Sequence, residues 1–561
     1  MAMRLGLGPV FAYEWLAISR RWQIYAGRAL FVATLLGAMT VGWAAHVASK
    51  PYLTIHEQAA VGQVYFNALV GTELWFVLLV APAAAAGALG TGSARPTLAQ
   101  MLATDLSAAE IVLGKLAARL VPVVAIIACV APVLALGSLL GGIDLEAMAG
   151  ACLITLAVGV LGCTLAAVLS VWGTGTHEIL LSVYAAWALW LLPSPTWQLL
   201  GWYWGIGPQP TWFEKAHPMR LAFAPYTQPG TVDLRDDLAF FGIVMVVSLI
   251  LTTIAIARLR AVATRQADGP SRPTSANHHR ARGGRGSRGP TLDDNPLRWR
   301  ERRVGQLSRW GRTLAMAYAG VGGAYAVLAI IDGVTGWGTT RDWLPACVNA
   351  YLLAIGAPIP GVIAAIALAH DRAAGSVDVL LTTPLSTRSI VWAKWRNAVR
   401  SIPLIVLLPS LVGASLALQG GSWLVVALMV ALAAAQAAAL TSLGLALATW
   451  ERRLGRALAF FVGLAFLLTA SWPDVVCSLF EYDTARLLAM ISPFQGAWQL
   501  TLAIRDPDAI AALQTMSWGA FWLLVALAAT VALLLASLAS FNRCLGRIPE
   551  RSRRHQQLSS D

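Results

Sequence analysis

The chain has 561 residues, of which 57% are hydrophobic and 12% charged, and its formal net charge is +13. A soluble domain carries about 25% charged residues and about 45–50% apolar ones, so this chain has too little charge to cover its apolar surface in water. The composition excludes a secreted, disordered or nucleic-acid-coating protein, and it predicts an integral membrane protein.

The first predicted element is an interfacial helix that precedes the first membrane span. Its large apolar residues have the spacing of one helical face: Phe11, Trp15, Ile18, Trp22 and Tyr25. Such a helix lies in the membrane interface, with its rings at the acyl boundary and its charges outward. A lipid anchor alone explains this pattern at least as well as contact with a partner does.

Twelve apolar runs along the chain are long enough to span a membrane. At a rise of about 1.5 Å per residue, each can cross a hydrocarbon core of about 30 Å. The runs lie near residues 29–47, 64–90, 116–140, 147–171, 179–200, 238–257, 313–335, 346–369, 401–418, 423–449, 457–479 and 517–541. We therefore expect an all-α polytopic fold, with Pro82, Pro358 and Pro360 kinking the second and eighth spans.

The basic residues lie mostly on one side of these twelve spans. The segments on the side of the two termini hold 34 of the 41 Lys and Arg residues, and the segments on the opposite side hold seven. The positive-inside rule therefore places both termini in the cytoplasm. The long connections on the opposite side, at 202–237 and 480–517, have room for short re-entrant helices.

A segment rich in Arg, Gly, Pro and Ser divides the chain near its midpoint. We predict a first six-span half at 1–258, a flexible cytoplasmic linker at 259–294, a second six-span half at 295–545 and a basic cytoplasmic tail at 546–561. The linker contains an RGG-like element, but a basic linker along anionic lipid headgroups is favoured over RNA binding. We expect no nucleic-acid partner.

The two halves repeat each other without a gap between residues 98–115 and 377–394, at an offset of 279. The matched pairs are Leu102/Leu381, Thr104/Thr383, Leu106/Leu385, Ser107/Ser386, Ile111/Ile390, Val112/Val391 and Lys115/Lys394. Ser386 is expected to cap the helix that follows it. Because six spans return each half to its starting side, we predict a parallel repeat, a pseudo-twofold axis along the membrane normal and a substrate path between the halves.

Few polar residues fall inside the predicted spans. They are Asn67 and Glu73 in the second span, Asn349 in the eighth and Gln436 in the tenth. An ionisable group at membrane depth is costly and by default suggests function, so these four residues are the candidate substrate path, with Glu73 first. A position near the outer interface, or a bond to a neighbouring helix, would explain Glu73 without transport.

No sequence pattern predicts a catalytic or metal site. The six cysteines are scattered without a C-x-x-C pair, and the His177-Glu178 pair has no third ligand. A Walker A loop needs a lysine followed by Ser or Thr, and none of the four lysines is followed by either. We therefore expect that the chain is not an enzyme and that any ATP hydrolysis takes place in a separate subunit.

The second half resembles the type-2 ABC transporter permeases in three of its segments. A cytoplasmic segment resembles the family's coupling motif at Gly375, Ser376, Asp378, Leu380, Leu381, Thr383, Pro384, Leu385, Ser386, Ile390 and Lys394. The family's entry helix is matched by Asn295, Pro296, Trp299, Arg300 and Glu301, and the short element before its last span by Ser492-Pro493-Phe494. The first half is similar only loosely, since Asp105 stands in place of the motif's proline.

The resemblance implies that the chain is the permease of an ABC exporter in the inner membrane of a bacterium. A separate cytoplasmic ATPase, in two copies, would bind ATP and Mg and would dock on the coupling segments of both halves. In the first half the coupling residues are Leu102, Thr104, Leu106, Ser107 and Lys115. The interfacial helices would carry Trp15, Trp22, Pro296, Trp299 and Glu301. The transported substrate is not identified by these residues.

A channel or secondary transporter that works alone is the main alternative. It predicts several buried ionisable residues along a pathway, whereas the spans offer little beyond Glu73. A membrane-embedded enzyme would need a converging Ser/His pair or two carboxylates at membrane depth, and the sequence does not suggest one.

Overall fold

The computed structural model describes residues 8–20, 54–89, 104–138, 143–172, 176–191, 209–268, 309–335, 343–373, 385–451, 454–473, 482–506 and 508–545. Shorter stretches and single positions between these ranges are described as well. The described residues form helices joined by turns and bends, without a strand. Their contacts divide the chain into two compact units, Met1–Ser287 and Arg288–Asp561.

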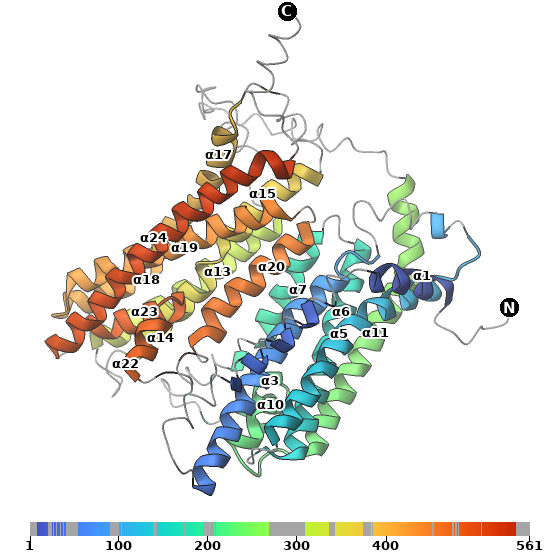
Figure 1. Cartoon of the computed structure of the whole chain (residues 1–561), viewed down its shortest axis with the longest axis horizontal. Helices are drawn as coiled ribbons and strands as arrows, with labels where there is room; N and C mark the ends of the chain where they lie inside the picture. Colours follow the sequence, from blue (N-terminus) through green and yellow to red (C-terminus); the bar gives the residue numbers. More distant parts are fainter. Residues whose placement is uncertain are drawn as a thin grey trace, which may run out of the picture. The chain divides into compact units, whose positions relative to one another are not determined.

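The first unit is built around one central helix, α6. Its helices are α1 (Gly8–Ser19), α3 (Ile55–Ala85), α5 (Ala108–Ser138), α6 (Leu145–Trp172), α7 (Thr176–Leu191), α9 (Thr211–Lys215), α10 (Pro218–Thr227) and α11 (Leu234–Asp268). α6 contacts α3, α5, α7, α10 and α11, and it lies beside α5 and α11 (Figure 1). Small residues allow this close packing: a Cβ atom at Gly159 would lie 3.2 Å from side-chain atoms of Val77 and Val123.

The second unit has a corresponding central helix, α19. Its helices are α13 (Arg309–Thr335), α14 (Trp343–Gly356), α15 (Ile359–Ala373), α17 (Thr387–Val399), α18 (Ile402–Leu418), α19 (Trp423–Trp450), α20 (Leu454–Phe466), the π-helix η3 (Leu467–Ser471), α22 (Tyr482–Ala489), α23 (Pro493–Ala503) and α24 (Ala509–Leu545). α19 contacts α15, α17, α18, α20, α23 and α24, and it runs alongside α24 (Figure 1). Gly444 of α19 packs against the backbone of Gly361 in α15, which leaves no room for a side chain.

Eight stretches of the described residues are helical, long and apolar enough to cross a membrane. They are Val61–Ala85, Ala108–Ser138, Leu145–Trp172, Leu234–Val262, Leu344–Ala369, Thr387–Leu418, Trp423–Trp450 and Ala509–Cys544, and they coincide with eight of the twelve predicted spans. Shorter apolar helices lie at the other four positions: Gly27–Gly37, Glu178–Leu191, Tyr318–Ile331 and Phe460–Thr469. The all-α polytopic fold is confirmed, whereas twelve full spans and the pseudo-twofold axis stay predictions.

The eighth predicted span is interrupted where its prolines lie. α14 ends at Gly356 and α15 begins at Ile359, with Pro358 in the turn between them. A proline lacks the amide hydrogen that a continuous helix needs and clashes with the preceding turn. The kink predicted in the eighth span is therefore found as a break between two helices. Pro82, in contrast, lies inside α3 near its end at Ala85.

The last helix of the first unit is longer than the sequence predicted. α11 continues to Asp268, past residue 258, where the first half was expected to give way to the linker. Residues 259–268 are mostly good helix formers, and the first helix-breaking pair, Gly269-Pro270, follows directly after them. Both connections expected to hold short helices do contain them: α9 and α10 in the first unit, and α22 and α23 in the second.

Candidate functional site

The predicted coupling segment of the second half ends in a capped helix. Ser386 is the N-cap of α17, and its Oγ accepts a hydrogen bond from the Ser389 amide at 3.2 Å. Leu385, directly before the cap, packs on a buried cluster that includes Ile390 of α17 and Phe541 of α24. The cap predicted at Ser386 is confirmed, and the apolar residue beside it is held against two helices.

The rest of the motif is only partly described. Thr383 is half-buried. Gly375, Asp378, Leu381 and Pro384 lie outside the described residues.

Lys394 is almost fully withdrawn from solvent, with 1% of its side chain exposed. From α17 its Nζ donates to a carboxylate oxygen of Asp371 at 2.6 Å and to the carbonyl of Ala367 at 3.2 Å. Both partners belong to α15 and lie one helical turn apart. A buried ammonium group is costly unless it is paired and hydrogen-bonded, so these contacts fix α17 against α15.

Arg372, the next residue after Asp371, ties the same end of α15 to α19. Its guanidinium donates to the carbonyls of Ala448 and Thr449 at 2.8 Å each and to that of Glu451 at 3.0 Å. The last carbonyls of a helix have no partner within the helix, so an arginine is a suitable cap for them. Sequence reasoning missed both residues, although the Asp-Arg pair at the end of an apolar run was a visible signal.

Two further bonds join α17 to its neighbours. The Trp395 indole N–H donates to the Ser442 Oγ of α19 at 3.0 Å. The Thr387 hydroxyl donates to Asn542 Oδ1 of α24 at 2.9 Å. α17 is thus hydrogen-bonded to α24 at its start and to α15 and α19 further along the helix.

In the first half, the matching segment ends in a capping box. Ser107 Oγ accepts from the Glu110 amide at 3.2 Å, and the Glu110 carboxylate accepts from the Ser107 amide at 2.8 Å. Leu102 and Leu106 are half-buried and Thr104 is exposed. The Leu106 carbonyl accepts a bond from Arg260 of α11 at 3.1 Å, which ties this segment to the last helix of its unit.

Lys115 of α5 is the buried lysine of the first unit, at 4% exposure. Its Nζ donates to the Ala88 carbonyl at 3.0 Å and lies 3.8 Å from a carboxylate oxygen of Glu14 on α1. Arg119, one turn further along α5, is 3.4 Å from the other oxygen of Glu14. Ala88 and Ala367 differ by 279 residues, which is also the offset between Lys115 and Lys394. The lysine-to-carbonyl contact therefore recurs at the offset predicted for the repeat.

A helix, α1, is present where the interfacial helix of the first half was predicted, and its place in the membrane interface stays a prediction. Val10 and Ile18 are buried, Trp15 is half-buried and Tyr13 is exposed, and the helix contacts α5. Trp22, Pro296, Trp299 and Glu301 lie outside the described residues.

The four candidate path residues have different surroundings in the described residues. Glu73 is fully buried in α3 with no partner for either carboxylate oxygen, whereas Asn67 is exposed on the same helix. Asn349 of α14 donates to Thr501 Oγ1 of α23 at 3.1 Å. Gln436 of α19 donates at 3.1 Å to two carbonyls just before α23. The last two residues thus bond to groups of their own unit.

The second unit matches a known protein family. Residues 313–544 match the family model described as ABC-2 family transporter protein. This part of the chain is therefore similar to the ABC-2 transporter family. Members of this family are the membrane permeases of ABC transporters, normally without enzymatic activity of their own, and they generally pair with an ABC ATPase. No curated protein matches the chain.

The matched range includes Lys394, Asp371 and Arg372, so the contacts that hold α17 lie inside the part of the chain that matches the family. The first unit lies outside the match, and its likeness to the matched part rests on the repeated residues and contacts. No cluster of three or more His, Cys, Asp or Glu side chains among the described residues could hold a metal ion.

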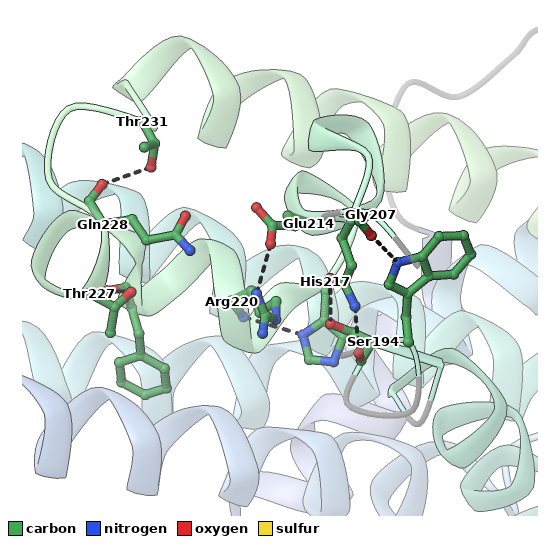
Figure 2. A network of polar contacts seen from close by, with 11 residues as sticks. Ser194, Gly207, Glu214, His217, Arg220, Thr227, Gln228 and Thr231 are labelled. Atoms are coloured by element: carbon green, nitrogen blue, oxygen red, sulfur yellow. Dashed lines mark hydrogen bonds and ion pairs between the residues drawn. The ribbon is translucent and has the colours of Figure 1, made fainter. Parts of the chain in front are cut away.

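A polar network in the first unit holds the start of α10 against the end of α7 (Figure 2). His217 is the N-cap of α10: its Nδ1 accepts from the Arg220 amide at 3.3 Å, and its Nε2 donates to the Leu191 carbonyl of α7 at 3.0 Å. These roles require a neutral ring with its hydrogen on Nε2. Burial lowers the pKa of His217 below its ordinary value of 6.5, which favours this neutral form. The Arg220 guanidinium donates to Glu214 of α9 at 2.9 Å.

The second unit has a cap with two comparable contacts. Ser492 is the N-cap of α23: its Oγ accepts from the Phe494 amide at 3.2 Å and donates to the Thr469 carbonyl of η3 at 2.8 Å. Both caps are followed by a proline, Pro218 or Pro493. Each cap therefore bonds a short helix to an earlier helix of its own unit, with a short helix, α9 or α22, between them in the chain, but only the first unit uses a titratable side chain.

Proposed function

We propose that the chain is the membrane-spanning permease of an ABC exporter, in which both halves act together as the permease. The observation that carries this proposal is the match of residues 313–544 to the ABC-2 transporter family. The recurrence of the buried lysine-to-carbonyl contact in the first unit supports a permease role for that half as well. The exporter moves an unidentified substrate across the inner membrane of a bacterium, with both termini of the chain in the cytoplasm.

ATP is hydrolysed by a separate subunit in this proposal. Two copies of a cytoplasmic ABC ATPase bind ATP and Mg, and each copy docks on one coupling segment. In the second half the segment comprises Gly375, Asp378, Leu381, Thr383, Pro384, Leu385, Ser386 and Lys394. In the first half it comprises Leu102, Thr104, Leu106, Ser107 and Lys115.

An ATPase docked on these segments would be able to displace the membrane-spanning helices that the segments join. When ATP closes the ATPase pair, the two segments move, and the packing between the halves switches from an inward-closed to an outward-open arrangement. Packed helices favour discrete arrangements, so nucleotide binding acts by biasing one of two states. The cap of α17 and its hydrogen bonds to α19 and α24 support this role, because a rigid element transmits a displacement.

Asn67, Glu73, Asn349 and Gln436 are the proposed substrate path. Glu73 has the strongest argument, since a buried carboxyl without a hydrogen-bond partner is costly and persists for a reason other than stability. Replacing Glu73 with Gln should abolish or redirect transport while the protein still folds. A transport rate unchanged by this substitution would remove Glu73 from the path.

ATPase measurements test the proposal as a whole. The tagged chain is purified from its host together with any P-loop ATPase, and the complex is reconstituted in nanodiscs. Leu385→Ala should reduce the ATPase activity of the complex, because Leu385 holds the motif against α17 and α24. Leu524→Ala, at an exposed position of α24, is the matched control.

Two results would contradict the proposal. One is the absence of any ATPase that binds the chain, or an ATPase rate insensitive to Leu385→Ala. The other is uphill movement of a solute by the chain alone without ATP, which would support the channel or secondary-transporter alternative.

A further inference from the structure

The two buried lysines have different carboxylate partners, although their carbonyl partners correspond. Lys394 pairs with Asp371 of α15, which belongs to the second span of its own unit. Lys115 pairs with Glu14 of α1, the predicted interfacial helix. The difference has a local cause, because residue 92, which stands 279 positions before Asp371, is a glycine.

Helix length explains why α15 can provide the acid itself. α15 stays helical to Ala373, so Asp371 lies one turn beyond Ala367 and on the same helical face. In the first unit α3 ends at Ala85, and Ala88 already lies in the bend that follows. A carboxylate from another element must therefore approach Lys115, and Glu14 does so with Arg119 as a second cationic partner.

We propose that Asp371 and Glu14 are positioning residues, which transmit the displacement of the coupling segments to different parts of the permease. Asp371 joins the segment of the second half to the second span of its unit. Glu14 joins the segment of the first half to the interfacial helix α1, which makes α1 a moving part of the transporter rather than a lipid anchor alone. This inference rests on the proposed function.

Both ion pairs are largely shielded from water. The side chains of Lys394 and Asp371 are 1% and 8% exposed, and those of Lys115 and Glu14 are 4% and 17% exposed. Pairs that are shielded from water are costly to separate, whereas exposed pairs exchange freely with solvent. A displacement of α17 should therefore move α15 with it, and a displacement of α5 should move α1, before either ion pair separates.

The test compares ATPase binding with ATPase coupling in the complex reconstituted in nanodiscs. Asp371→Asn and Glu14→Gln should each leave the affinity for the ATPase within about twofold and should lower the permease-dependent ATPase stimulation about fivefold or more. The conservative Asp371→Glu should retain most of the stimulation, because it keeps the charge. Asp508→Asn and Glu146→Gln, at exposed positions in the two units, are the matched controls.

A second variant separates positioning from stability. The double variant Asp371→Asn with Lys394→Met removes both charges, which buried pairs often tolerate, and it should fold yet remain uncoupled. Wild-type stimulation in the folded double variant, or in Asp371→Asn and Glu14→Gln, would overturn the inference. Failure of the wild-type chain to bind or stimulate any ATPase would instead overturn the proposed function.

Discussion

Both halves of the chain pair a buried lysine with a carboxylate, but the carboxylate comes from a different element in each half. Each buries one lysine against a carbonyl of the segment at the end of its second span. The second half completes the site within two helices, with a short bond of 2.6 Å to Asp371. The first half recruits α1, and its Glu14 is shared between Lys115 and Arg119 at longer distances. A repeated sequence therefore preserves the cation and the carbonyl, while the anion depends on how far the preceding helix extends.

The largest expected effect of this difference is on stability. Lys394→Met leaves Asp371, which is 8% exposed, without its ammonium partner, and should cost about 3–5 kcal/mol. Lys115→Met should cost only about 1–2 kcal/mol, since Glu14 is more exposed and keeps Arg119. Unfolding of the full chain in detergent by denaturant, followed by tryptophan fluorescence, measures both losses. Equal losses would show that the two lysine sites are equivalent after all.

Much of this arrangement could be predicted from the sequence. The apolar runs gave the positions of the helices because a membrane span needs about 20 apolar residues. The gapless repeat drew attention to Lys115 and Lys394, and the residues around Ser386 indicated its helix cap. These features are local, so spacing along the chain determines them.

The partners of those residues could not be predicted in the same way. Glu14 and Lys115 are about a hundred positions apart, and only the packing of α1 on α5 brings them together. The correspondence of His217 and Ser492 was hidden because the residue types differ, although the proline after each cap was a visible signal. Contacts between distant segments depend on helix packing, which the periodicity of one segment does not specify.

A second comparison concerns the buried polar groups of the second predicted span in each half. Asn349 donates to Thr501, whereas neither carboxylate oxygen of Glu73 has a partner among the described residues. Asn349→Leu should therefore cost about 1–2 kcal/mol, and Glu73→Leu should be neutral or stabilising by about 1–3 kcal/mol. The same detergent unfolding experiment measures both changes. A large loss for Glu73→Leu would mean that Glu73 has a structural partner.

The caps of α10 and α23 should respond differently to acid. Burial lowers the pKa of His217, so the folded state binds the proton less readily than the unfolded state does. The cap is therefore fully effective above about pH 6.5 and weakens as the pH falls through the lower value in the folded protein. Arg220 on the same helix opposes the protonation of His217, and the Arg220 guanidinium is itself paired with Glu214 of α9.

Hydrogen exchange of α10 and α23, corrected for the intrinsic rate at each pH, tests this difference. Loss of the His217 cap should lower the local stability of α10 by up to about 2 kcal/mol between pH 7 and pH 5, while α23 stays unchanged. His217→Ser installs the cap of the other half and should remove the pH dependence. A pH response that persists in His217→Ser would assign the effect to another group.

The smallest expected effect concerns the caps of the coupling segments. Glu110 and Ser389 occupy equivalent positions, but only Glu110 can return a carboxylate to the amide of its cap residue, while the Ser389 hydroxyl donates to the Ser386 carbonyl at 2.9 Å. Ser107→Ala and Ser386→Ala should each cost about 1 kcal/mol. Ser389→Glu would complete a capping box at α17 and should raise stability by about 0.5 kcal/mol, because the Ser386 amide would gain an acceptor and the carboxylate would lie at a helix N-terminus. A decrease instead would mean that the Ser389 hydroxyl matters more to this turn than a carboxylate does, and that the two coupling segments require different first turns.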